Sequence, residues 1–276
     1  MKTCTFCTSF LLLSLLIDSC TDPNVANEPG TPHEGKFGGS ESGDVLSLYP
    51  SANSDYGVIQ VNNESQTYPA GSAATAILRA QFSSDTISSR TLVDAGEVTI
   101  ASATLSKDVG YGSTYYSATT NTNSTDGVQV IFSVAGNSTT GVPAFTDSLY
   151  VSDVLTVTAP TFDTTAGGFV ADKSTGLSVS WSTDASTDSC FIVLTYLAAK
   201  DTAGFGDIYP HRYWWVHTAD DGAYTFSSEI LSAFTANNVT LLMTIVRGTT
   251  KRIAVGSKNY FLKGTSSALT PLLLVP

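Results

Sequence analysis

Hydrophobic and polar residues alternate with a period of two along much of the chain. Leu177, Val179 and Trp181 alternate with serines, and similar alternation runs through 76–82 and 128–134. Successive side chains of a strand point to opposite faces, so each pattern predicts a strand with one buried and one solvated face. The runs 190–197 and 239–246 are apolar on both faces, which predicts central strands.

Further strands are predicted where short runs rich in strand-forming residues are separated by Gly, Asn, Asp and Ser clusters. These runs are Gly57–Val61, Glu97–Leu105, Thr114–Thr119, Ser148–Val151, Val154–Thr158, Arg212–His217, Arg252–Ser257 and Asn259–Leu262. The segment 227–234 predicts a helix of about two turns. Ser227 or Ser228 would cap this helix, and Ile230, Leu231 and Phe234 would share its apolar face.

The elements together predict an all-β fold with two antiparallel β-sandwich domains. A body that begins near Val45 is long for one sandwich, because about 100 residues is typical. Pro160 follows a predicted strand, and the polar, Gly-containing stretch 161–175 comes next. We therefore expect one domain at 45–159 and a second at 160–276.

The second half resembles fibronectin type III and related immunoglobulin-like domains. The likeness rests on LSVSW (177–181), on the strand at Cys190, and on the hairpin-like pair VTLLMTIVR and KRIAVGS. It implies a sandwich fold, although the 207–217 insertion and the short helix depart from it. Three phrases of the first half, DAGEVTI, VIFSVAGNS and VPAFTDSLYV, resemble secreted bacterial lipoproteins and bring no activity with them.

The N-terminus has the pattern of an export signal. Lys2 precedes an apolar run that ends at Ile17, too short for a membrane helix of about 20 residues. We interpret residues 1–19 as a signal peptide. Ile17-Asp18-Ser19-Cys20 resembles the lipobox of bacterial lipoproteins, which implies acylation of Cys20. Asp18 departs from the small residue usual there, and cleavage by the general signal peptidase is the alternative.

The segment 20–44 is predicted to be a disordered tether, because it holds almost no large apolar residue to offset its ordering entropy. A lipidated cysteine followed by a flexible spacer predicts a protein exported and anchored to an envelope membrane, at the outer membrane or the cell surface. The expected partners are that membrane, through the lipid, and a glycan or an envelope protein.

Charge and cysteine content narrow the function classes. The net charge of −11 argues against nucleic acid or an anionic membrane surface as partner. Cys4 and Cys7 would be lost with the signal, so Cys190 would be the one thiol left beside an acylated Cys20. Its apolar surroundings predict a small buried hydrophobe rather than a catalytic thiol.

The chain lacks the common motifs of catalysis and cofactor binding. It contains no Gly-x-Ser-x-Gly, Walker A, His-Glu-x-x-His or EF-hand pattern, so we predict no cofactor and no metal. His211 and His217 would lie about 20 Å apart on one strand. Asp220 and Asp221 could serve a Ca²⁺ or acid/base site, but Asp221-Gly222 predicts a hairpin turn between 213–218 and 223–226.

The aromatic segment Tyr209–His217 is the most unusual stretch of the sequence. Alternation places Tyr213, Trp215 and His217 on one strand face, and Arg212, Trp214 and Val216 on the other. One interpretation is an aromatic platform for a sugar ring or a peptide, with Trp214, Trp215, Arg212 and His217 as the ligand-binding candidates. The alternative is that one tryptophan fills the core and the other covers a domain junction.

Three functions remain open at this point. The first is a non-enzymatic, lipid-anchored envelope protein with a structural, adhesive or interaction role. The second is a surface lipoprotein that binds carbohydrate or peptide through the Trp214/Trp215 region. The third, ranked last, is a hydrolase whose site is assembled from distant residues.

Overall fold

The structure, a computed structural model, describes residues 54–68, 71–87, 91–110, 113–196, 213–232, 234 and 239–276. The predicted signal peptide, the tether, Cys20 and Arg212 lie outside the described residues. Strands account for most of the described chain, so the predicted all-β class is confirmed. The helix α3 (Ser228–Ser232) lies within the segment where a helix is predicted.

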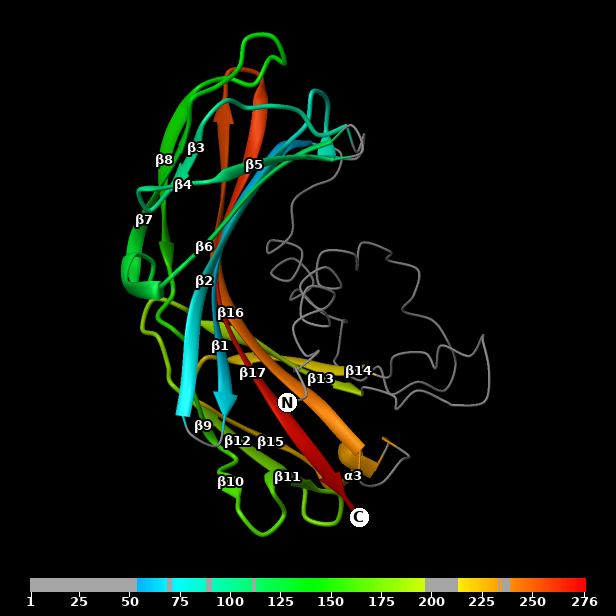
Figure 1. The fold of residues 1–276 in the computed structure, drawn as a ribbon. Helices are drawn as coiled ribbons and strands as arrows, with labels where there is room; N and C mark the ends of the chain where they lie inside the picture. The colour runs from blue at the N-terminus through cyan, green and yellow to red at the C-terminus, as the bar shows by residue number, and fades with distance from the viewer. Residues whose placement is uncertain are drawn as a thin grey trace, which may run out of the picture. The chain divides into compact units, whose positions relative to one another are not determined.

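The largest element is a ten-stranded sheet in the order β14-β13-β16-β17-β1-β2-β6-β5, with β11 beside β17 and β10 beside β11 (Figure 1). Most pairs are antiparallel, but β17 runs parallel to β1 and to β11. The strands are β1 (Asp55–Tyr68), β2 (Gly71–Phe82), β5 (Ser106–Gly110), β6 (Ser113–Thr120), β10 (Phe162–Asp163), β11 (Gly168–Asp172), β13 (Ser189–Tyr196), β14 (Tyr213–Ala219), β16 (Val239–Val255) and β17 (Lys258–Val275).

Two small sheets pack against one face of this sheet. The first has the order β15-β12-β9 and the second the order β4-β3-β7-β8. Their strands are β3 (Val98–Ile100), β4 (Ala103–Thr104), β7 (Val128–Val134), β8 (Phe145–Val151), β9 (Val157–Ala159), β12 (Leu177–Trp181) and β15 (Ala223–Phe226). We call the face of the ten-stranded sheet that they cover the core face, and the opposite one the open face.

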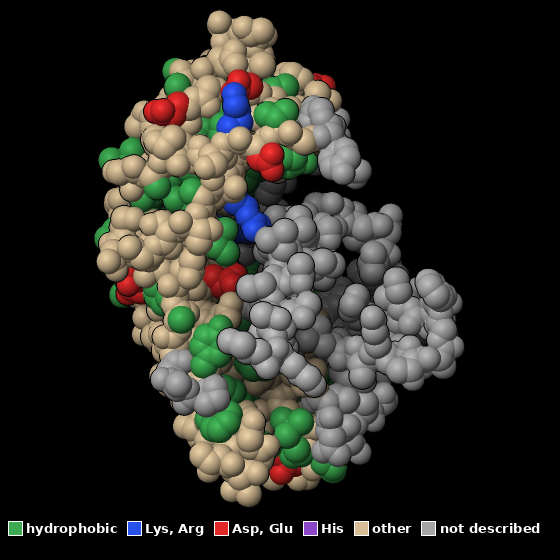
Figure 2. All heavy atoms as spheres, viewed as in Figure 1, with side chains coloured by type: hydrophobic (Ala, Val, Ile, Leu, Met, Phe, Trp, Pro, Cys, Tyr) green, Lys and Arg blue, Asp and Glu red, His purple; other side chains and the backbone are tan. Residues whose placement is uncertain are grey.

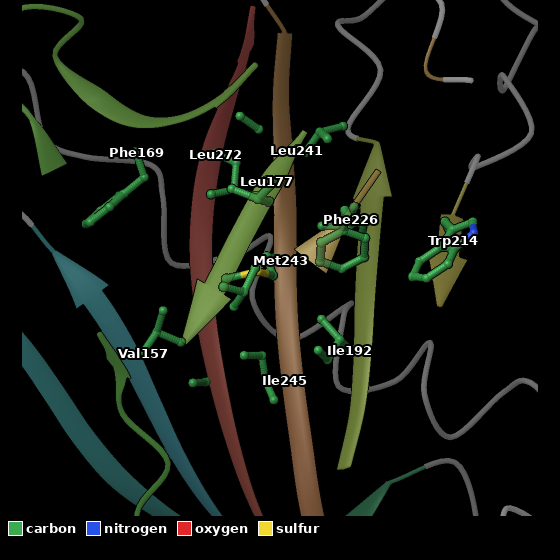
Figure 3. Packing of buried hydrophobic residues seen from close by; sticks show 14 of the residues in the cluster. Val157, Phe169, Leu177, Ile192, Trp214, Phe226, Leu241, Met243, Ile245 and Leu272 are labelled. Atoms are coloured by element: carbon green, nitrogen blue, oxygen red, sulfur yellow. The ribbon is translucent and has the colours of Figure 1, made fainter. Parts of the chain in front are cut away.

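The first hydrophobic cluster lies between the three-stranded sheet and one end of the ten-stranded sheet. Figure 3 shows Leu177 of β12 and Phe226 of β15 near Ile192, Met243 and Ile245 of the larger sheet. These five side chains are all at least 96% buried. Complete burial of such a side chain contributes about 1.5–3 kcal/mol.

The second cluster lies between the four-stranded sheet and the other end of the ten-stranded sheet. Val98, Phe132 and Val151 of the small sheet meet Leu78 and Leu262 of the large one. Both clusters therefore use the same large sheet, because β16 and β17 are long enough to contribute to each.

A row of buried polar side chains separates the two clusters on the core face. The strand register places Arg247 opposite Ser266, and Ser266 opposite Asn63. Asn63 and Ser266 donate to the Ser152 carbonyl at 3.4 and 2.8 Å. Ser152 lies in the segment that joins β8 of the four-stranded sheet to β9 of the three-stranded sheet. These hydrogen bonds therefore fix this connecting segment to the large sheet.

The predicted hairpin between VTLLMTIVR and KRIAVGS is wrong. VTLLMTIVR and the first five residues of KRIAVGS belong to β16, a single strand of 17 residues, and β17 is its hairpin partner. The turn lies at Gly256, whose φ of +62° suits glycine. Thr249 and Thr250 can continue the strand because β17 pairs with them on one side throughout.

The predicted domain boundary between residues 159 and 160 does not separate two sheets. Strands from both sides of this boundary belong to the ten-stranded sheet. β1 and β2 precede the boundary, β16 and β17 follow it, and β1 pairs with β17 from Asp55 to Gln66. The division into two domains stays a prediction.

Candidate functional site

Strand β14 sends its two tryptophans to opposite faces of the sheet. Trp214 lies on the core face, is 4% exposed, and packs against Phe226 with ring centroids 5.1 Å apart (Figure 3). It therefore belongs to the first hydrophobic cluster and offers no ring face to a ligand. This placement leaves Trp215 and His217 as the described members of the predicted platform.

Trp215 and His217 share the open face with Phe191 of the neighbouring strand β13. The Phe191 and His217 rings are stacked, with centroids 4.6 Å apart and 14° between their planes. Phe191 and Trp215 are 6.2 Å apart and tilted by 46°. All three side chains are half-buried. We call Phe191, Trp215 and His217 the aromatic cluster.

The strand register shows what lies beside the aromatic cluster on the open face. One row crosses the sheet from the Trp215 position and ends on β1: Trp215, Val193, Thr244, Leu269 and Gln66. The next row starts at His217: His217, Phe191, Val246, Ser267 and Glu64. The strands between the aromatic cluster and β1 therefore carry no large aromatic or charged side chain in these two rows.

Hydrogen bonds link the polar residues at the β1 end of the two rows. Tyr68 donates its hydroxyl proton to Oε1 of Gln66, and Nε2 of Gln66 donates to Oε1 of Glu64 at 3.5 Å. Burial raises the pKa of Glu64, while the Gln66 bond and the Arg79 charge act in the opposite direction. We call Glu64, Gln66 and Tyr68 the polar strip.

Asp220, considered above for a Ca²⁺ or acid/base site, is buried and fully engaged by protein groups. Its carboxylate accepts hydrogen bonds from Trp181 Nε1 and Thr187 Oγ1, both at 2.7 Å. It also forms an ion pair with Arg247 at 3.1 Å. These bonds occupy the oxygens that a metal ion or a substrate would need, so Asp220 serves to hold the fold.

The turn at Asp221-Gly222 is present, but the predicted hairpin around it is wrong. β14 pairs with β13 in the ten-stranded sheet, whereas β15 pairs with β12 in the three-stranded sheet. The turn thus carries the chain from one layer to the other. Gly222 adopts a φ of +86°, and its carbonyl accepts a bond from the Trp181 amide at 3.0 Å.

Cys190 is fully buried in the first cluster, as its sequence context predicts. Burial is the largest cause that raises the pKa of its thiol to about 12, and the Asp220 charge adds to the effect. A thiol of this kind is a poor nucleophile, because the thiolate is the reactive form.

Sequence reasoning missed Phe191, Glu64 and Gln66. Phe191 lies in the apolar run at Cys190, where nothing marks it as facing away from the core. Glu64 and Gln66 follow a predicted strand that ends too early, at Val61. The polar residues Gln60, Asn62, Glu64 and Gln66 at every second position are the signal that could have extended it.

Among the residues described here, no group of three or more His, Cys, Asp or Glu side chains is placed to hold a metal ion. No helix within the same residues is long and apolar enough to cross a membrane. Comparison with protein-family models and with curated proteins finds no match for the chain.

Proposed function

We propose that this chain is a non-enzymatic, lipid-anchored envelope protein that binds a partner through the open face of its large sheet. The observation that carries the proposal is the placement of the aromatic cluster. Phe191, Trp215 and His217 lie on the face that the two small sheets leave uncovered, while Trp214 enters the core. Aromatic rings supply much contact area in recognition because they are large and rigid.

A non-enzymatic role is supported by the burial of two potentially reactive side chains, the Asp220 carboxylate and the Cys190 thiol. The Asp220 carboxylate is committed to Arg247, Trp181 and Thr187. The Cys190 thiol is buried with a strongly raised pKa. Both groups stabilise the interior of the protein, and neither is presented to a substrate.

Anchoring is supported by the N-terminal sequence. The apolar run that ends at Ile17, the lipobox-like step to Cys20, and the polar stretch that follows are the order expected of a tethered lipoprotein. A chain with a net charge of −11, in which only 13% of the residues are charged, also suits the exterior of an envelope. The described surface in Figure 2 shows scattered charges among uncharged polar atoms.

The predicted pair of sandwich modules, divided at 159 and 160 and fibronectin-like in the second half, belongs to the same proposal. Two separate hydrophobic clusters, each beneath its own small sheet, support it. Because β16 and β17 contribute to both clusters, the two modules would be rigidly joined and would not move independently.

The binding part of the proposal is tested with the full-length Cys20→Ala chain, which lacks the proposed lipid, sedimented with isolated envelope material. We expect Trp215→Ala to lower the bound fraction at least tenfold. Ile131→Ala, a substitution at a 59% exposed apolar residue of β7, should leave it unchanged. Equal sedimentation of the Trp215→Ala variant and its Cys20→Ala parent would refute the proposed surface.

The anchor is tested separately by growing producing cells with an alkyne-tagged fatty acid. The tag should be attached to the unsubstituted chain and lost in Cys20→Ala. A chain that never takes up the tag, or a Cys20→Ala chain that keeps it, would show that Cys20 is not the acylated residue.

A further inference from the structure

We propose that residues 45–53, the segment that leads into β1, pack on the open face of the large sheet and cover its centre. The inference goes beyond the proposed function and does not depend on the lipid anchor. It assigns a partner within the same chain to a set of side chains on β17 and β1. Residues 45–53 themselves lie outside the described residues.

A stripe of buried side chains runs along the open face on β17 and β1. Phe261, Thr265, Ser267 and Leu269 point to this face from β17, and Val58 lies beside Phe261 on β1. Their exposed fractions are 1%, 5%, 6%, 5% and 6% in that order. We call these five residues the buried stripe.

The buried stripe is separate from both hydrophobic clusters. Val58, Phe261 and Leu269 belong to neither cluster, although each is at least 94% buried. The two small sheets that bury the clusters lie on the opposite face of the large sheet. Apolar side chains on a sheet face are removed from water only when something packs over them, so the buried stripe has a cover of its own.

Arg252 supplies part of that cover, at one end of the stripe. Its guanidinium lies over the Phe261 ring, 5.1 Å from the ring centroid. The Arg252 side chain itself remains 42% exposed, which places it at the rim of the covered area. Leu269 lies eight residues further along β17, about 27 Å away and beyond the reach of this side chain.

Residues 45–53 are attached at one end of the buried stripe and have the right length to follow it. Asp55 begins β1 and pairs with β17 two positions before Phe261. Ser54 lies in a turn immediately before that strand. The stripe from Phe261 to Leu269 is about 27 Å long, and nine extended residues span about 30 Å. A chain that reverses at Ser54 therefore runs along nearly the whole stripe.

The sequence of the segment suits an apolar cover. It opens with VLSLY (45–49), in which four of five residues are large and apolar, whereas the preceding stretch 20–44 holds almost none. In an extended chain Leu46 and Leu48 point to the same side, which places both against the sheet. The following PSANS (50–54) is rich in residues typical of turns, as a reversal before β1 requires.

A cover over the buried stripe confines partner binding to one end of the open face. The aromatic cluster lies on β13 and β14, and β16 separates β13 from β17. A partner of the proposed function would therefore contact the β13–β14 end, while the chain itself occupies the centre.

The test is thiol labelling of single cysteine variants in the full-length Cys20→Ala chain, with the label located by mass spectrometry. Leu48→Cys should react about a hundredfold more slowly than Asn27→Cys, because its reaction requires local opening of the cover. Ser47→Cys is the matched control. It lies on the other side of the extended segment and should react nearly as fast as Asn27→Cys.

A second substitution in the sheet shows where the segment packs. Phe261→Ala should speed the labelling of Leu48→Cys about tenfold or more, since it removes the largest side chain of the buried stripe. Val58→Ala is a milder change that should act in the same direction. Ile131→Ala, on the outer sheet, should have no effect, and circular dichroism checks that each variant folds.

Three results would overturn the proposal. Labelling of Leu48→Cys as fast as that of Asn27→Cys would show that the segment does not pack. Slow labelling that neither Phe261→Ala nor Val58→Ala changes would place the segment elsewhere. Protection that disappears when the protein is diluted would assign the cover to a second copy of the chain.

Discussion

The guanidinium of Arg247 and the carboxylate of Asp220 form a fully buried ion pair, with Nη1 and Oδ2 3.1 Å apart. Arg247 also donates to the Ser182 carbonyl at 2.5 Å and to the Asp153 carbonyl at 2.9 Å. One side chain of β16 therefore reaches three separate segments: the turn between β14 and β15, the residue after β12, and the connection between β8 and β9. Arg247 lies between the two hydrophobic clusters. There it provides hydrogen-bond donors for backbone carbonyl groups that follow strands of the small sheets.

Arg247→Met should lower the free energy of unfolding by about 3–5 kcal/mol, because removal of one partner leaves a buried charge without its counter-ion. Urea unfolding followed by circular dichroism measures the change. The control is Lys251→Met, which breaks the more exposed ion pair with Asp147. We expect that variant to lose about 1 kcal/mol or less. Similar losses in the two variants would contradict a special role for the buried pair.

Fluorescence quenching should separate the three tryptophans by their burial. Trp181 and Trp214 are each 4% exposed, whereas Trp215 is half-buried on the open face. We expect Trp215→Phe to remove most of the acrylamide-quenchable emission of the native protein. Trp181→Phe and Trp214→Phe should leave it largely intact. A large loss in Trp214→Phe instead would place that ring at the surface.

Stability should fall in acid partly through Asp94. A hydrogen bond from Tyr116, followed by one from Lys107, lowers the pKa of Asp94 from 3.8 to about 2. A carboxyl whose pKa is lower in the folded state stabilises the fold above the unfolded-state pKa and loses that effect as the pH falls. The urea midpoints of the unsubstituted chain and of Asp94→Asn should differ above pH 4 and converge towards pH 2. A difference that stays constant over this range would rule out the ionised carboxyl as its source.

Gly248 should be intolerant of any side chain. A Cβ at this position would lie 2.4 Å from the Gly264 carbonyl oxygen and 2.9 Å from the Thr265 Cα, both backbone atoms of β17. We expect Gly248→Ala to cost about 1–3 kcal/mol of stability, since forced overpacking strains the paired strands. Gly110→Ala is the control, because a Cβ there meets no atom within 4 Å. Equal thermal unfolding midpoints for both variants would show that β16 and β17 can move apart at little cost.

The sequence was sufficient for the local elements but not for their partners. Alternation located β7 and β12 well and the second half of β2, which begins five residues before the predicted run, since the pattern of a half-buried strand depends only on neighbouring positions. It stopped β1 at Val61, although the strand continues to Tyr68. The residues beyond Val61 are mostly polar because they face the open side and the buried polar row, and hydrophobicity alone does not reveal such positions.

The candidate site was predicted in part. The aromatic segment was recognised, and alternation correctly placed Trp214 and Trp215 on opposite faces. Which of the two tryptophans faces the core depended on the pairing of β14 with β13 and on the packing of Trp214 against Phe226 of β15. Glu64 and Gln66 join the aromatic cluster on one face only through the register of five strands.

The amino-acid sequence by itself determined the β class, most of the strands, the turn at Gly222 and the export-like N-terminus, because each depends on residues within a few positions of one another. Tertiary structure alone decided that β1 lies parallel to β17, just over 200 positions away, with Gln60 opposite Lys263. It also decided that Asp220 meets Arg247 rather than a ligand. Such pairings depend on burial and register across the whole sheet, and no local pattern encodes them.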